Sequence, residues 1–171
     1  PAPPRRDLQT TLGIKQNDSV LVFMGSIFRF SGLTELLTEL APALRNDQSL
    51  KLLILGDGED FDQLRKLTNS YELQSQVIMP GRIEYDLLAN YLCLGHVALL
   101  PFRQELVTHG ALPGKVLQYL ACGLPTIATP LNGLMSMVAS GQGVVYASDL
   151  TKMAVEAVDL AYDPHRRKII S

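Results

Sequence analysis

Six apolar runs of strand length alternate along this chain with segments of helical periodicity. The runs lie at residues 20–25, 50–56, 76–81, 96–101, 125–130 and 143–147. Strands that are buried on both faces of a parallel sheet are apolar throughout, and each parallel neighbour needs a crossover that is usually a helix. The alternation therefore predicts an α/β fold, a Rossmann-like three-layer sandwich with a parallel sheet of about six strands.

Helices are predicted between these runs. After the first run, leucines recur at helical spacing, at positions 33, 36, 37, 40 and 44. Ser31 is the predicted N-cap of this helix, and Pro42 is expected to kink its last turn. Further helices are predicted at about residues 59–71, 85–93, 114–122 and 150–162.

The composition is that of one folded domain. The chain has 171 residues, and its 47% apolar and 19% charged residues exclude a disordered segment and a membrane span. A formal charge of -2 and 6% aromatic residues disfavour nucleic-acid binding. Cys93 and Cys122 lack the spacing of a metal site, which predicts reduced core thiols and a cytoplasmic protein. The Pro- and Arg-rich start predicts a linker rather than a secretory signal.

The segments that follow the predicted strands are rich in glycine, as in GSIFRFSG (25–32), GDGED (56–60) and GRIE (81–84). In an open α/β sheet, ligands bind outside the carboxyl ends of the strands, where glycine lets backbone N–H groups approach a phosphate. A nucleotide is the predicted ligand. GDGEDF lacks the third glycine of a dinucleotide fingerprint, and the sequence holds no P-loop, HExxH or GxSxG motif.

Three stretches together resemble a known family. They are LKLLILGDGED (50–60), VIMPGRIEYDLLANYLCLGHVALLPF (77–102) and KVLQYLACGLPTIATPLNGL (115–134). Over about residues 12–162 the chain resembles the carboxyl-terminal half of the GT-B glycosyltransferases of retaining family 4, also called group 1. The resemblance implies a domain that binds the nucleotide-sugar donor. It divides the chain into a linker from a missing N-terminal acceptor domain (1–14) and a donor-binding domain (15–171) that lacks the family's C-terminal helical extension.

The resemblance also implies the site residues. Lys115 and Arg29 are the expected catalytic residues, because cations and a helix start stabilise the charge of a departing diphosphate without a metal. Where the family has a glutamate that binds the ribose, Gln118 offers a neutral acceptor, weaker by roughly 1 kcal/mol. The expected donor-binding residues are Gly25, Ser26, Gly56, Gly58, Arg82, Ile83, Gly114, Val116 and Gln118.

Four positions depart from the family pattern. Ser26 and Ser31 stand where the family has cations, and Gly110 and Gln118 stand where it has glutamates. These departures support an alternative, a degenerate and non-catalytic nucleotide-sugar-binding or scaffold module on the same fold. A further alternative is a protein like the sugar-nucleotide 2-epimerases, which share the GT-B fold, with His109 as a candidate catalyst.

The leading hypothesis is an enzyme, a glycosyltransferase of the hexosyltransferase type that uses a UDP-, GDP- or ADP-sugar with retention. Because a helix start and cations are expected to hold the diphosphate, neither a metal nor a cofactor is expected. The expected partner is the protein's own N-terminal acceptor-binding domain, and the isolated half is expected to turn over little. Through that domain the full-length protein is expected to associate peripherally with the inner face of the membrane. The base, the sugar, the acceptor and the oligomeric state are left open.

Overall fold

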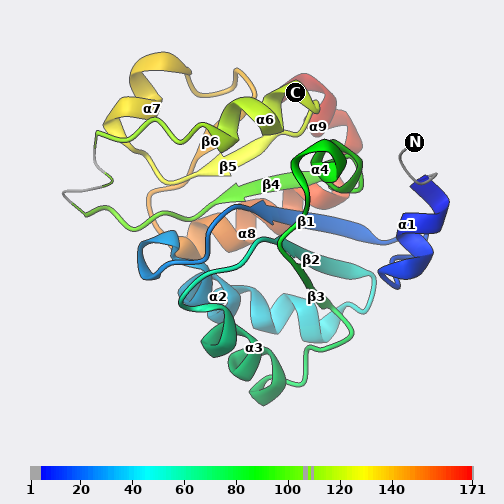
Figure 1. The fold of residues 1–171 in the computed structure, drawn as a ribbon. Coiled ribbons are helices and arrows are strands. Elements are labelled where there is room, and N and C mark those ends of the chain that lie inside the picture. Colours follow the sequence, from blue (N-terminus) through cyan, green and yellow to red (C-terminus); the bar gives the residue numbers. More distant parts are fainter. Residues whose placement is uncertain (1–4, 106–107, 109, 171) are drawn as a thin grey trace.

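A single parallel sheet forms the centre of the molecule (Figure 1). The computed structural model describes residues 5–105, 108 and 110–170. Its six strands lie in the order β3-β2-β1-β4-β5-β6, and every neighbouring pair is parallel. The strands are β1 (Ser19–Met24), β2 (Leu50–Leu55), β3 (Val77–Gly81), β4 (Val97–Leu100), β5 (Thr126–Ala128) and β6 (Val144–Tyr146). The predicted Rossmann-like α/β fold is therefore confirmed.

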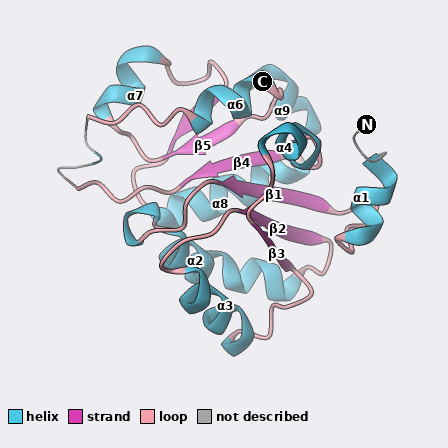
Figure 2. Cartoon of the chain, in the orientation of Figure 1, coloured by secondary structure: helices cyan, strands magenta, loops and turns pink. Residues whose placement is uncertain are grey.

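Helices cover both faces of the sheet (Figure 2). They are α1 (Arg5–Thr11), the 3-10 helix η1 (Arg29–Ser31), α2 (Leu33–Asn46), α3 (Phe61–Ser70), α4 (Tyr85–Leu92), α6 (Lys115–Ala121), α7 (Asn132–Met137), α8 (Leu150–Tyr162) and α9 (Pro164–Ile170). Four of the predicted helices appear as α3, α4, α6 and α8, and the leucine pattern appears as α2. The short helices α1, α7 and α9 were not predicted, because they are too short to show a clear period.

The core consists of one apolar layer on each face of the sheet. Along β1, Leu21 and Phe23 pack with α2 and α8 on one face, whereas Val22 and Met24 pack with α1, α4 and α6 on the other. Figure 1 shows these helices on opposite sides of the sheet. Successive side chains of a strand point to opposite faces, so a strand buried on both faces must be apolar at every position. This burial explains the continuous apolar runs.

The start of α2 differs from the prediction. Gly32, with φ 67°, occupies the N-cap, and no side-chain hydrogen bond caps the helix. Ser31 instead ends η1 and is buried, so its prediction as an N-cap is wrong. Pro42 lies inside the helix, which ends four residues later at Asn46.

Residues 5–14 pack against the rest of the domain. Residues 5–11 form α1, and Leu8 and Ile14 are buried against β1 and α4. The proposed domain boundary at residue 14 stays a prediction. No helix within the described residues has both the length and the apolar character that a membrane crossing requires.

The two cysteines end helices on the same face of the sheet. Cys93 follows α4 and is exposed, and Cys122 follows α6 and is partly buried. Both are free thiols, but the prediction that they lie in the core is wrong for Cys93. Burial, followed by the neighbouring Cys93, raises the pKa of the Cys122 thiol.

Candidate functional site

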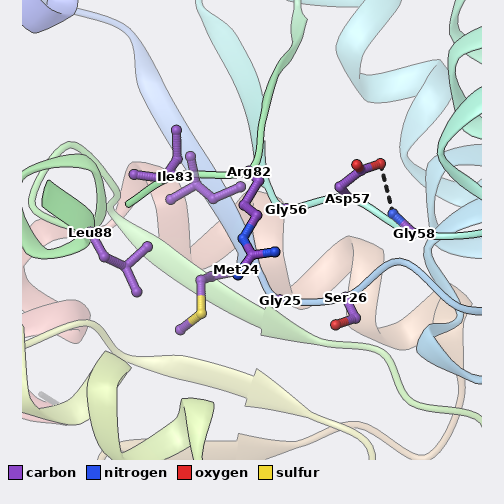
Figure 3. A pocket seen from close by; sticks show the side chains of 10 residues that line it. Met24, Gly25, Ser26, Gly56, Asp57, Gly58, Arg82, Ile83 and Leu88 are labelled. Atoms are coloured by element: carbon purple, nitrogen blue, oxygen red, sulfur yellow. Dashed lines mark hydrogen bonds between the residues drawn. The ribbon is translucent and has the colours of Figure 1, made fainter. Parts of the chain in front are cut away.

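A pocket of about 460 Å³ opens where β1, β2 and β3 end (Figure 3). It lies at the carboxyl ends of the strands, where ligands bind in open α/β sheets. Six of the predicted donor-binding residues line it, namely Gly25, Ser26, Gly56, Gly58, Arg82 and Ile83. The structure therefore brings together residues from three loops that are far apart in the sequence.

The loops after β1 and β2 pack against each other backbone to backbone. Gly25 N–H donates to the Leu55 carbonyl at 2.8 Å, and Ile27 N–H donates to the Asp57 carbonyl at 3.0 Å. A Cβ at Gly56, where φ is 151°, would collide with the carbonyl oxygen of Gly25. Only glycine permits this approach. Gly56 is therefore required by the contact between the two loops, before any ligand is considered.

The pocket has an apolar wall and a polar rim. Met24, Ile83 and Leu88 face it from β1, the β3 exit and α4 (Figure 3). On the rim, Arg82 is exposed, and the Asp57 carboxylate accepts a hydrogen bond from the Gly58 N–H at 2.8 Å. An apolar wall with a few polar groups suits a flat ring that carries polar edges, such as a nucleobase.

Lys115, the first residue of α6, reaches across to the end of β1. Its ammonium lies so close to Gly25 that a Cβ there would collide with Nζ and Cε. Nζ lies 4.5 Å from the centroid of the Phe23 ring and 4.8 Å from that of Phe102. Burial lowers the pKa of Lys115 from 10.5 to about 8. No carboxylate in the described part of the chain pairs with this lysine. A partly buried cation without a counter-ion is suited to bind an anion.

The other predicted residues at α6 are Gly114, Val116 and Gln118. The side chain of Val116 is fully buried beside Leu100 and Phe102, and its N–H donates to the Pro113 carbonyl at 3.0 Å. Val116 therefore presents neither a side chain nor a free N–H to a ligand. Gly114 is exposed, and Gln118 is partly buried with no side-chain hydrogen bond to another described residue. Neither residue lines the pocket.

Arg29 also lies outside the pocket. It starts η1, is exposed, and pairs with no carboxylate of the described residues. Arg103, in the loop after β4, forms an ion pair with Glu35 of α2. His109, the candidate catalyst of the epimerase alternative, lies outside the described residues.

Sequence reasoning missed several residues that shape the site. Met24 and Leu55 are the last residues of their strands, and Leu88 lies on α4. Tyr119 was missed because the seven residues of α6 show no clear buried face in the sequence: Leu117 is 54% exposed, whereas Tyr119 is fully buried. A tyrosine within a short apolar helix was the available signal, because a buried hydroxyl needs a hydrogen-bond partner.

Comparisons with known proteins agree with this architecture. The sequence model of one protein family, the group 1 glycosyl transferases, matches residues 4–170 of this chain. The chain is 25% identical over 166 residues to the alpha-D-kanosaminyltransferase of Streptomyces kanamyceticus. The matched segment covers 96% of this chain and 42% of that protein. It is also 30% identical over 173 residues to the D-inositol 3-phosphate glycosyltransferase 1 of Catenulispora acidiphila. This match covers 95% of this chain and 40% of that protein. The chain thus spans about two fifths of the length of these relatives.

Solved structures share the fold at lower identity. The C-terminal domain of the group 1 glycosyl transferase LpcC from Francisella tularensis has a TM-score of 0.78 at 17% identity, covering 99% of this chain and 88% of that one. Anabaena HepE in complex with UDP and glucose has a TM-score of 0.79 at 16% identity, and the match covers 97% of this chain and 44% of that one. The chain therefore belongs to the group 1 family of glycosyltransferases, and its fold is that of the C-terminal half of a GT-B enzyme.

Proposed function

We propose that this chain is the donor-binding half of a retaining, metal-independent glycosyltransferase. The observation that carries the proposal is the position of Lys115, whose ammonium lies over Gly25 beside a pocket formed by three strand exits. A cation next to a glycine backbone offers a diphosphate one full positive charge and close approach to N–H groups. The pocket beyond it takes the nucleoside.

The pocket suits the nucleoside in size and character. Its volume of about 460 Å³ lies within the range of roughly 300–1,000 Å³ typical of small-molecule sites. Ile83 and Leu88 would pack against the base, while Arg82 and backbone groups of its loop would bind the polar edge of the ring. The ribose would then extend toward α6, where the side-chain amide of Gln118 makes no hydrogen bond to any described residue.

The chemical contribution of this half is electrostatic. When the glycosidic bond breaks, its electron pair moves to the oxygen of the departing nucleoside diphosphate. Lys115 stabilises this charge as it develops, in a site that is partly closed to water. Arg29, exposed in the loop after β1, would approach the diphosphate only once the donor is bound. The acceptor, its deprotonation and the retained configuration at the anomeric carbon depend on the partner domain as well.

UDP is the first nucleotide to test. Structures that share the fold include Anabaena HepE in complex with UDP, with UDP and glucose, and with UDP-glucose. The matching relatives include a kanosaminyltransferase and an N-acetylglucosaminyl L-malate synthase, so the sugar varies within the family. GDP- and ADP-sugars stay within the proposal. No cofactor is included.

A degenerate, non-catalytic module remains the second candidate. The observation that favours it is Ser31, which stands where the family pattern has a lysine and whose side chain is buried. With Ser26 at the other cation position, Lys115 and Arg29 are the cations left for the diphosphate. Sugar transfer by a full-length protein would exclude this candidate.

Isothermal titration calorimetry with UDP, ADP and GDP tests the proposal directly. We expect at least one of the three to bind, and Lys115→Ala to weaken binding by roughly tenfold or more, the usual loss when one charged hydrogen-bond partner is removed. Lys66→Ala, which removes an exposed lysine of α3, serves as the control and is expected to bind normally. Absence of binding for all three nucleotides at millimolar concentration would refute the proposal.

A further inference from the structure

The hydroxyl group of Tyr119 lies buried at the end of β1. The side chain is fully buried, and Met24 N–H donates to its hydroxyl at 2.7 Å. The same hydroxyl donates to the Met24 carbonyl at 3.3 Å. Tyr119 therefore pairs with both backbone polar groups of the residue that precedes Gly25. A hydroxyl can do so because it both donates and accepts hydrogen bonds.

These backbone groups need a partner because β1 and β4 separate before β1 ends. The pairing of β1 with β2 extends to Met24, opposite Leu55, whereas its pairing with β4 reaches only Val22, opposite Ala98. Between β1 and β4 the chain order of the strands reverses, and at such a switch point the sheet opens a crevice. Tyr119 inserts its hydroxyl there in place of the missing strand.

Tyr119 and Lys115 contact adjacent residues of the same strand exit. The two residues are four apart on α6, so their side chains lie on one face of the helix. Tyr119 is hydrogen-bonded to Met24, and Lys115 lies over Gly25. The position of the ammonium relative to the Gly25 backbone thus depends on how α6 is held against β1.

We propose that Tyr119 is a positioning residue for the diphosphate site, where its hydroxyl holds α6 so that the Lys115 ammonium lies over Gly25. This inference rests on the proposed function, since it assigns Tyr119 to the same site. Tyr119 does not contact the nucleotide. It acts through Lys115 and through the backbone at Gly25.

The test compares Tyr119→Phe with a matched hydroxyl deletion elsewhere in the fold. Tyr146 is a suitable control, because its hydroxyl donates to the Val138 carbonyl at 2.8 Å and Tyr146 does not line the pocket of the strand exits. Tyr146→Phe therefore also leaves a carbonyl without its partner. Both variants are expected to unfold at a lower temperature than the wild type, because Tyr119→Phe loses buried hydrogen bonds and Tyr146→Phe loses a partly buried one.

Two readouts separate positioning from mere stability. The first is the titration of Lys115, followed by NMR of protein labelled at lysine Cε. In the wild type we expect a pKa of about 8. In Tyr119→Phe the ammonium gains water, so we expect its pKa to move back toward 10.5. The second readout is the affinity for UDP, ADP and GDP, expected to fall roughly tenfold in Tyr119→Phe. Tyr146→Phe is expected to change neither readout.

The outcomes distinguish this inference from the proposed function. An unchanged Lys115 pKa in Tyr119→Phe, or an equal change in Tyr146→Phe, would overturn the positioning role. Failure of the wild type to bind any of the three nucleotides would instead refute the proposed function, while the Lys115 titration would still decide whether Tyr119 positions the ammonium. If Tyr119→Phe is partly unfolded, the titration is repeated with trimethylamine N-oxide, which favours the folded state without contacting the site.

Discussion

Replacing Lys115 with methionine should stabilise the ligand-free protein. A pKa lowered from 10.5 to about 8 means that burial disfavours the charged ammonium by about 3 kcal/mol, at about 1.4 kcal/mol per pKa unit. The faces of Phe23 and Phe102, 4.5 and 4.8 Å from Nζ, offset about 0.5–1 kcal/mol each. A net cost of about 2 kcal/mol remains at neutral pH. Methionine fills similar space without the charge. The melting temperature of the Lys115→Met variant should therefore exceed that of the wild type by roughly 5 °C.

The stability gained by Lys115→Met should decrease as the pH rises. Below pH 8 the lysine is protonated in both the folded and the unfolded chain, so the folded state bears the full cost. Between pH 8 and 10.5 the folded state releases its proton while the unfolded chain keeps it, and the stability of the wild type rises relative to the variant. Thermal and urea unfolding at pH 7, 9 and 10.5 should therefore show the advantage of Lys115→Met shrinking toward zero.

The matched control is Lys66→Met on the exposed surface of α3. Its stability should stay within about 0.5 kcal/mol of the wild type, with no comparable pH trend. If Lys115→Met is no more stable than the wild type at pH 7, or if its advantage does not shrink with pH, then the ammonium is well solvated. Burial would then not disfavour the charged form of Lys115.

The same lysine predicts how nucleotide binding responds to pH. A bound diphosphate places negative charge beside the ammonium and so raises the pKa of Lys115 above about 8. Binding at pH 8–9 should therefore take up a fraction of a proton, and affinity should fall as the pH rises above 8. Calorimetry in buffers with different ionisation enthalpies measures this uptake. A pH-independent affinity that survives Lys115→Met would show that Lys115 does not contact the ligand.

Further predictions concern the glycines and one helix cap. Gly56→Ala should destabilise the fold by more than about 2 kcal/mol in urea unfolding, because its Cβ would meet the rigid Gly25 carbonyl at a positive φ. Gly114→Ala, where φ is -54° and the space is open, should instead be neutral or stabilising by up to about 1 kcal/mol. Asp149→Ala should lower the melting temperature, because the Asp149 side chain caps α8 by accepting from Lys152 N–H; Asp149→Asn should retain most of the wild-type stability.

Much of the fold could be predicted because it depends on local patterns. The six runs became six strands, since burial on both faces requires every residue of a strand to be apolar, as in the segment from Val20 to Met24. The loops after β1, β2 and β3 form one pocket because the carboxyl ends of parallel strands share an edge. Six residues that the family resemblance implied for donor binding line this pocket, and their role in binding stays a prediction. The short helices and the buried face of α6 could not be predicted, because seven residues cannot show a helical period clearly.

By itself, the sequence determined the order of the elements, the parallel sheet and the edge at which a ligand can bind, because periodicity and strand exits are properties of neighbouring residues. Only the tertiary structure decided how α6 meets that edge. The sequence places Lys115 and Tyr119 ninety or more residues after Met24 and Gly25, and nothing local indicates that they touch. Their contact arises because β1 and β4 separate at the switch point and leave backbone groups for a side chain to satisfy.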